Sequence, residues 1–300
     1  MRSRIIDLDG PVHVADFGGS GTPIVLVHGL GGSHANWLCV GERLAECGRV
    51  LAPDLAGFGR TPLAGRSSGV GANRALLDRF LGATCDEPAV LVGNSMGGLI
   101  SLMEASLRPE KVAALVLVGP AQPRPLLVAP NWRIMATFAA YAMPMVGETF
   151  VRWRSRLLGP EGVVRQTLEL CCVDSSRIAP EVFAAHVALA EERASGMPWA
   201  AEAFLGAARS VVSRTLRAGW FAELVRAVRA PTLVVQGDAD RLVPVLASRA
   251  LAESRPDWRL EVMPGIGHVP QLEAPDRFVD VVGAWLDEVR APAGEIRDRA

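Results

Sequence analysis

The sequence has no excess of charge of either sign and is poor in lysine and in aromatic residues. Its 300 residues include 31 Lys and Arg and 32 Asp and Glu, a formal net charge of −1. A balance this even excludes the broad basic surface that nucleic-acid binding requires, so no nucleic-acid partner is expected. Lys111 is the single lysine, and we attribute the preference for arginine to coding bias rather than to function.

Cysteine is also too scarce to form a structural framework. The five cysteines are odd in number, include no CxxC pair, and have no histidine at zinc-finger spacing. This pattern excludes a disulfide scaffold and a finger-type zinc site. We expect free, mostly buried thiols in a reducing compartment, which indicates a cytoplasmic protein. The sequence predicts no cofactor and no metal site.

Long hydrophobic runs are missing as well. Residues 1–9 are too charged and too short in apolar content for a secretory signal. The most lipid-like stretch, residues 134–151, is interrupted by Pro144, Gly147 and Glu148. It therefore falls short of the roughly 20 apolar residues that span a bilayer. We expect a cap helix or a buried helix pair and no stable membrane insertion, with a role at a membrane surface as the alternative.

What the chain does contain is enough apolar sequence for a packed core, at 50% hydrophobic and 21% charged residues. Short apolar runs without alternation recur along it, and most are followed by a helical pattern. We expect strands at residues 12–17, 24–27, 50–52, 89–92, 112–118, 232–236 and 260–263. We expect helices at residues 37–47, 73–81, 95–107 and 278–289. This order predicts an α/β fold with a mostly parallel sheet that is covered on both faces.

One long segment, residues 122–216, breaks this alternation. It begins in a proline-rich stretch, continues in helical patterns, and contains no alternating strand pattern. A connection of about 95 residues is far too long for a loop, so we expect an inserted helical lid or subdomain. The predicted domains are a core of residues 1–120 and 220–290, a helical cap of residues 121–219, and a polar C-terminal tail of residues 291–300.

The large apolar side chains of this predicted cap are expected mostly in its core, with some lining an apolar substrate pocket. They are Trp132, Phe138, Tyr141, Met143, Met145, Trp153, Phe183, Met197, Trp199 and Phe204.

A nucleophile motif lies between a predicted strand and a predicted helix. Residues 93–97 read G-N-S-M-G and fit the pattern G-x-S-x-G. The pattern alone is weak evidence, but the strand before Ser95 and the helix after it are the setting of a nucleophile elbow. In such a turn the serine projects from the carboxyl edge of the sheet, and the helix N-terminus favours a developing negative charge.

A glycine-rich loop follows the second expected strand and can supply the oxyanion donors of an acyl-transfer site. The backbone N–H of Met96, directly after the serine, is the first expected donor. The second is the N–H of Leu30, with Gly31 as the alternative. His28 lies too early in the chain to act as the base, and we expect it to be a hydrogen-bonded structural residue.

The remaining groups of a catalytic triad follow two late strands. Asp240 lies in the loop after strand 232–236, and His268 lies in the loop after strand 260–263. The chain order Ser95, Asp240, His268 is that of α/β-hydrolases. His268 would take the proton of the Ser95 hydroxyl, and Asp240 would fix the tautomer of His268 and stabilise its charged form.

Five motifs in this order resemble the α/β-hydrolase-fold family with a helical cap. They are residues 28–32 (HGLGG), 54–59 (DLAGFG), 93–98 (GNSMGG), 237–244 (GDADRLVP) and 267–275 (GHVPQLEAP). The resemblance implies a mostly parallel sheet flanked by helices, an inserted helical cap, and hydrolysis without a cofactor. In the family pattern the second aspartate of G-D-x-D is usually the triad acid, which implies Asp240, with Asp238 as the alternative. Residues 119–120 offer no carboxylate, so the acid position used by some relatives is empty here.

The resemblance also limits which reactions of this fold family the chain is expected to catalyse. Ser95 argues against the haloalkane dehalogenases and epoxide hydrolases of this fold, which use an aspartate nucleophile. The elbow also resembles that of the C–C hydrolases that split meta-cleavage products, but those usually carry tryptophan after the catalytic histidine, where this chain has Val269. We therefore expect a serine hydrolase for a carboxylic ester of an apolar small molecule. The alternatives are a C–C hydrolase and a non-catalytic binding protein on a hydrolase scaffold.

Overall fold

A single mixed sheet organises the protein. The computed structural model describes residues 1–125 and 132–291; most of the predicted tail, from residue 292, lies outside them. Eight strands follow the order β1-β2-β4-β3-β5-β6-β7-β8. Their bounds are β1 Arg2–Asp7, β2 Pro11–Gly18, β3 Pro23–Val27, β4 Arg49–Pro53, β5 Ala89–Asn94, β6 Val112–Val118, β7 Thr232–Gly237 and β8 Arg259–Met263. Strands β3 to β8 are parallel, and β1 and β2 add an antiparallel edge.

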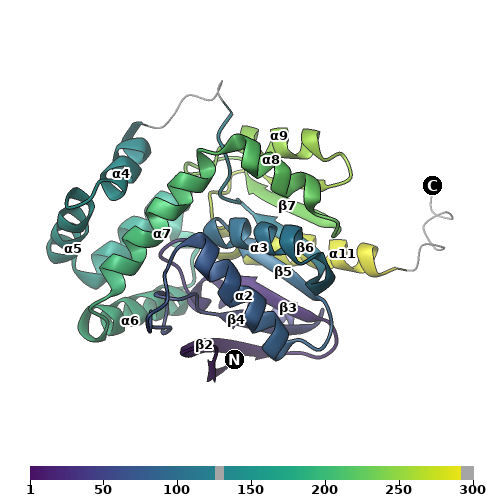
Figure 1. Ribbon diagram of the computed structural model, residues 1–300, viewed down its shortest axis with the longest axis horizontal. Helices are drawn as coiled ribbons and strands as arrows, with labels where there is room; N and C mark the ends of the chain where they lie inside the picture. The colour runs from purple at the N-terminus through teal and green to yellow at the C-terminus, as the bar shows by residue number, and fades with distance from the viewer. Residues whose placement is uncertain (126–131, 292–300) are drawn as a thin grey trace.

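The central strands are apolar on both faces because helices cover both (Figure 1). In β3, Val25 and Val27 pack into one core cluster, whereas Ile24 and Leu26 pack into the other. The first cluster takes its helical side chains largely from α2, α3 and α8, and the second from α1 and α11. The helices of the sheet domain are α1 Gly41–Leu44, α2 Val70–Thr84, α3 Met96–Leu107, α8 Ala218–Ala227, α9 Val245–Ser254, α10 Pro270–Glu273 and α11 Pro275–Arg290. The predicted fold class is confirmed.

Ahead of α8, the described part of the chain between β6 and β7 forms four α-helices. They are α4 Trp132–Ala142, α5 Val146–Cys171, α6 Pro180–Gly196 and α7 Ala200–Thr215. Helix α5 is kinked at Gly159, which has a φ of 63° and precedes Pro160. Helix α4 packs against α5 and α7, and α7 in turn contacts α2 and α8 of the sheet domain. Figure 1 shows α4 and α5 at the outer left edge of the molecule, far from the C-terminal helix α11.

Helix α6 is anchored to the loop that follows β4. Arg193 donates hydrogen bonds from Nη1 to the carbonyl of Gly59 at 2.8 Å and from Nη2 to that of Gly57 at 2.9 Å. The neighbouring Glu192 forms an ion pair with Arg60 at 2.7 Å. Because these contacts join the insertion to the sheet domain through backbone carbonyls, they fix the insertion relative to the sheet edge.

Three details differ from the sequence-based expectations. The predicted helix over residues 37–47 is a 3₁₀ turn, His34–Trp37, followed by the four-residue α1. The thiols are free as expected but not mostly buried, since only Cys172 is buried and the other four are half-buried. The ten large apolar residues of the insertion are not mostly core, because only Tyr141 is buried. Four of them are exposed by more than half: Trp132, Met143, Met145 and Trp153.

A buried carboxylate in α3 makes folding stability depend on pH. Glu104 is fully buried, and burial, with repulsion from Asp78, raises the pKa of its side chain to about 7 against the attraction of Arg74. Because the pKa of Glu104 is higher in the folded than in the unfolded chain, protonated Glu104 contributes to folding stability below about pH 4.5. That contribution is lost as the pH rises towards 7.

We therefore expect Glu104→Gln to be more stable than the parent protein at pH 8, by about 1–2 kcal/mol allowing for screening, and not at pH 4.5. Denaturant unfolding at the two pH values tests this, with the exposed Glu110→Gln as control. An equal effect at both values would contradict the assignment.

Candidate active site

Ser95 occupies a strained turn between β5 and α3. Its backbone has a φ of 54° and a ψ of −114°, a conformation that non-glycine residues avoid. Gly93 and Gly97 make the turn possible. A Cβ at Gly93 would lie 2.5 Å from the carbonyl oxygen of Gly97, and a Cβ at Gly97 would lie 2.1 Å from that of Val27. A strained serine backbone with glycines on either side is typical of a nucleophile elbow, a turn in which the serine side chain projects away from the sheet.

Asp240 and His268 form a buried pair in the loops after β7 and β8. Asp240 Oδ2 lies 2.7 Å from His268 Nδ1, and His268 is only 4% exposed. The other oxygen, Oδ1, accepts the backbone N–H groups of Leu242 and Val243 at 2.8 and 2.9 Å. Gln236 Nε2 donates a further bond to Oδ2 at 3.0 Å. Since every donor approaches from a fixed direction, the carboxylate cannot turn away from the imidazole.

Asp238, the alternative acid, faces elsewhere. Its Oδ1 accepts the N–H of Gly265 at 2.8 Å, and its side chain is exposed. The two aspartates of the G-D-x-D motif therefore have different tasks. Asp238 ties the β7 loop to the turn after β8, whereas Asp240 contacts the imidazole of His268.

Ser95 lies close to this pair without bonding to it. Asn94 Nδ2 donates to the carbonyls of His268 at 3.1 Å and of Val118 at 3.0 Å, and the N–H of Ser95 donates to the same Val118 carbonyl at 2.9 Å. Of the hydrogen bonds within the described residues, none joins Ser95 Oγ to His268. Such bonds are often long before substrate binds, so the arrangement is compatible with a serine and its base.

The expected oxyanion donors flank the serine. A Cβ at Gly29 would lie 3.2 Å from Ser95 Cβ, which places the glycine-rich loop directly beside Ser95. Met96 is the first residue of α3, where a backbone N–H has no partner within its own helix. Within the described chain no backbone carbonyl accepts the N–H of Leu30, Gly31 or Met96. Both sides of a two-donor oxyanion site are thus available around Ser95.

His28 is a structural residue, as its ring contacts show. Nε2 accepts the N–H of Leu55 at 3.0 Å, and Nδ1 lies 2.8 Å from the carbonyl of Gly29, to which it can donate as a neutral ring. Burial lowers the pKa of this imidazole to about 4, against the attraction of Asp54. The ring is neutral at physiological pH and holds the glycine-rich loop in place.

A second buried cluster joins His13, His34 and Asp54. The carboxylate accepts from Nδ1 of both imidazoles at 2.8–3.0 Å and from the backbone N–H groups of His34 and Arg60. Burial raises the pKa of Asp54, but the two histidine bonds outweigh it and hold the pKa below its usual range. One ring nitrogen of each histidine and one carboxylate oxygen lie within 4.8 Å of one another, so these three atoms could serve as ligands of a metal ion. The carboxylate already accepts four donors, so it is satisfied as part of a hydrogen-bond network.

Glu273 connects the histidine loop with the insertion. Its buried carboxylate accepts the N–H of Gly267 on Oε2 at 2.7 Å, and the N–H groups of Val173 and Asp174 on Oε1 at 2.9 Å. Next to it, the N–H of His268 donates to the carbonyl of Cys171, at the end of α5, at 2.6 Å. The backbone on which His268 is carried is therefore fixed by the end of α5 and by this one carboxylate.

We expect Glu273→Gln to lower kcat by about 10–100-fold with a smaller change in KM. An amide offers one acceptor oxygen instead of two, so its NH₂ group would face either Gly267 or the Val173–Asp174 turn. Steady-state kinetics measure the effect, with the exposed Glu253→Gln as the matched control. A positioning role also predicts a changed pH–rate profile, whereas a loss of stability with an unchanged kcat would contradict it.

Sequence reasoning assigned no task to Asn94, Gln236 or Glu273. Asn94 and Gln236 carry a detectable signal, because each is a polar residue near the carboxyl end of a mostly apolar, fully buried strand. Glu273 belongs to the last motif, but its partners Val173 and Asp174 lie about a hundred positions earlier in the chain. No local pattern reveals such a contact.

Comparisons with known proteins show what the chain as a whole is similar to. The family model described as "alpha/beta hydrolase fold" matches residues 22–275. The chain is 32% identical to 2-hydroxymuconate semialdehyde hydrolase of Pseudomonas sp. (strain CF600), over 92% of this chain and 90% of the relative. It is 31% identical to 2-hydroxy-6-oxo-2,4-heptadienoate hydrolase of Pseudomonas putida, over 89% and 90%. A thermophilic esterase from Thermogutta terrifontis has a similar structure, with a TM-score of 0.68 and 26% identity over 97% of this chain and 100% of that one.

Proposed function

Because this chain belongs to the alpha/beta hydrolase fold family, we propose that it is a serine hydrolase with Ser95, His268 and Asp240 as its triad. Its substrate would be a carboxylic ester of an apolar small molecule. The observation that carries this proposal is the buried pair of Asp240 and His268, 2.7 Å apart, beside a strained serine. A binding protein on the same scaffold needs neither the strain nor the pair.

The proposed mechanism follows from the position of each group. His268 Nε2 removes the hydroxyl proton of Ser95 as Oγ attacks the ester carbonyl. The N–H groups of Met96 and Leu30 hold the oxyanion, with Gly31 as the alternative to Leu30. The imidazolium then protonates the departing alcohol, which leaves an acyl-enzyme. The same imidazole activates water, which releases the acid and restores Ser95.

We propose that the helices α4–α7 form the cap of this site, within the boundaries 121–219. The support is the apolar cluster between cap and loop, in which Phe204 and Leu30 pack on Tyr141, Leu205 and Ala208. An apolar roof beside the oxyanion loop favours an apolar acyl or alkyl group in the substrate.

A C–C hydrolase is the second candidate, and a specific observation favours it. The two relatives reported above, both about 30% identical, are hydrolases of meta-cleavage products. Against it stands Val269, in the position where those enzymes usually have tryptophan. In this chain Val269 is buried and packs in one apolar cluster with Leu168 and Leu272.

Two assays with the purified protein separate these proposals. The first is labelling with a fluorophosphonate, read by intact mass. The second compares p-nitrophenyl esters of increasing acyl length with a vinylogous diketo acid. We expect stoichiometric labelling and ester turnover that peaks at one acyl length. Labelling with preferred turnover of the diketo acid would indicate the C–C hydrolase, and a folded protein with neither labelling nor turnover would overturn the enzyme proposal in favour of a binding scaffold.

A further inference from the structure

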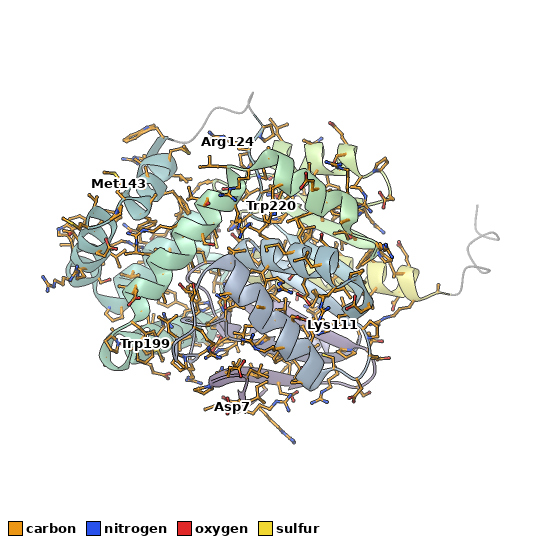
Figure 2. All side chains as sticks on the ribbon, viewed as in Figure 1. Asp7, Lys111, Arg124, Met143, Trp199 and Trp220 are labelled. Atoms are coloured by element: carbon orange, nitrogen blue, oxygen red, sulfur yellow. The ribbon has the colours of Figure 1, made fainter. Side chains whose placement is uncertain are left out.

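The outer surface of α4 and the first half of α5 is apolar although it faces solvent. Among the described residues, seven of the 14 exposed large hydrophobic side chains lie between residues 132 and 157. We call this surface the α4–α5 apolar face and define it by Trp132, Met135, Met143, Met145, Trp153 and Leu157. Their exposed fractions run from 48% for Met135 to 79% for Met145. Figure 2 shows Met143 at the outer margin of the molecule, away from the sheet.

The face follows helical periodicity. On α4, Trp132 and Met135 share one outward stripe with the exposed Ala136 and Ala139, and Met143 follows directly after the helix. The opposite side of the same helix is apolar too, because Phe138 and Tyr141 pack inward. A helix whose two opposite sides are both apolar is normally covered on both of them. On α5, Val146, Trp153 and Leu157 are seven and four residues apart and form a second exposed stripe. Val146 and Trp153 of this stripe line an open hollow of about 480 Å³.

Positive charge borders the face. Residues 132–157 contain four arginines and one carboxylate, Glu148, in a chain whose net charge is −1. Glu148 is already paired with Arg209 at 2.8 Å. Arg152 and Arg156 are exposed and adjoin Trp153 and Leu157 in the sequence. Apolar and tryptophan side chains with flanking arginines, whose stems can reach along an apolar layer to the head groups, have the composition of a helix that lies in a lipid–water interface.

We propose that the α4–α5 apolar face docks on an anionic lipid surface. A second copy of the chain is a poorer fit, because a two-fold contact would bring the same arginines towards one another without a free carboxylate between them. Within the described residues, no single helix is long and apolar enough to cross a bilayer, and α4 with α5 passes that test only as a pair bent by 114°. The inner sides of both helices remain packed on α7, so the pair lies on the lipid rather than across it.

The docked face adjoins the proposed site. The inward side chains Phe138, Tyr141 and Phe150 pack with Phe204, whose ring lies 5.0 Å from that of Tyr141. A Cβ at Gly31, in the oxyanion loop, would lie 3.3 Å from Phe204. One apolar layer thus separates the lipid surface from the oxyanion loop. If the proposed hydrolase function holds, on which this step rests, the substrates are esters held at a lipid surface.

Flotation of the full chain with vesicles tests the docking. We expect binding to an equimolar mixture of phosphatidylcholine and phosphatidylglycerol, and weaker binding to phosphatidylcholine alone. The apparent partition constant should fall about tenfold or more in Trp153→Ser/Leu157→Ser, and to a similar extent in Arg152→Glu/Arg156→Glu. The matched controls, Leu246→Ser and Arg249→Glu on the exposed side of α9, should bind like the parent. Thermal unfolding midpoints show that each variant is folded.

Ser95→Ala separates docking from chemistry, because it should bind vesicles like the parent protein. Binding by that variant supports docking even if no ester is ever hydrolysed. Failure to bind either vesicle, or an equal loss in the α9 controls, would overturn the proposal. So would a dimer in solution that the α4–α5 variants dissociate, since a second copy would then cover the face.

Discussion

Replacement of Ser95 by alanine is expected to lower kcat for the best ester substrate by about 10⁶-fold. It should also abolish labelling by a fluorophosphonate. The reason is that Oγ forms the covalent bond in both reactions, and Ser95 is the single hydroxyl-bearing residue between Gly93 and Gly97. The exposed Ser213→Ala is the matched control and should retain full activity. Residual turnover above a hundredth of the parent rate would contradict the nucleophile assignment.

The same position carries a stability prediction. Ser95 has a φ of 54°, which alanine inherits together with its Cβ. Glycine adopts this conformation without strain, so Ser95→Gly relieves a cost of about 1–3 kcal/mol. That relief outweighs the roughly 0.5–1 kcal/mol by which glycine favours the unfolded chain. Both variants should be inactive, and Ser95→Gly should have the higher unfolding midpoint. A lower midpoint for Ser95→Gly would mean that the elbow stores no strain.

The core of the fold was predictable because it rests on local patterns. Every predicted strand has a counterpart, since buried parallel strands read as apolar runs such as those of β5 and β6. Strand β1, Arg2–Asp7, was missed because it lies at the edge of the sheet. Only two of its residues, Arg4 and Ile6, are half-buried, and the others are exposed, so it has the composition of a surface segment. The sheet-domain helices α8 and α9 were missed too, although both are amphipathic and lie at the expected place between apolar runs.

The insertion was less predictable for a different reason. Its apolar residues read as core because composition does not reveal which side of a helix finds a partner. Tyr141 is buried, whereas Met145, four residues later, is 79% exposed. The contact of Glu273 with Val173 likewise depends on how α5 ends beside the histidine loop. Such contacts belong to the packing of whole elements and leave no trace in a local pattern.

Asp240→Asn is expected to lower kcat by about 10⁴-fold while leaving the fold in place. The asparagine oxygen can still accept the N–H groups of Leu242 and Val243, which keeps the side chain in its present orientation. Its NH₂ group then faces His268 Nδ1, 2.7 Å away in the parent. A donor at that position stabilises the tautomer with the proton on Nε2, and such a ring cannot take the proton of Ser95.

Asp238→Asn is the control that isolates this effect, because it makes the same chemical change two residues away. It alters only the acceptor of the Gly265 N–H, so we expect kcat within a few-fold of the parent and a stability loss of about 1 kcal/mol. Steady-state kinetics and denaturant unfolding of both variants measure the difference. If Asp238→Asn were the more damaging to kcat, the acid would be Asp238 and the loop would have to rearrange to present it. If both were harmless, His268 would be oriented by its backbone contacts alone, and the pair would not be a catalytic one.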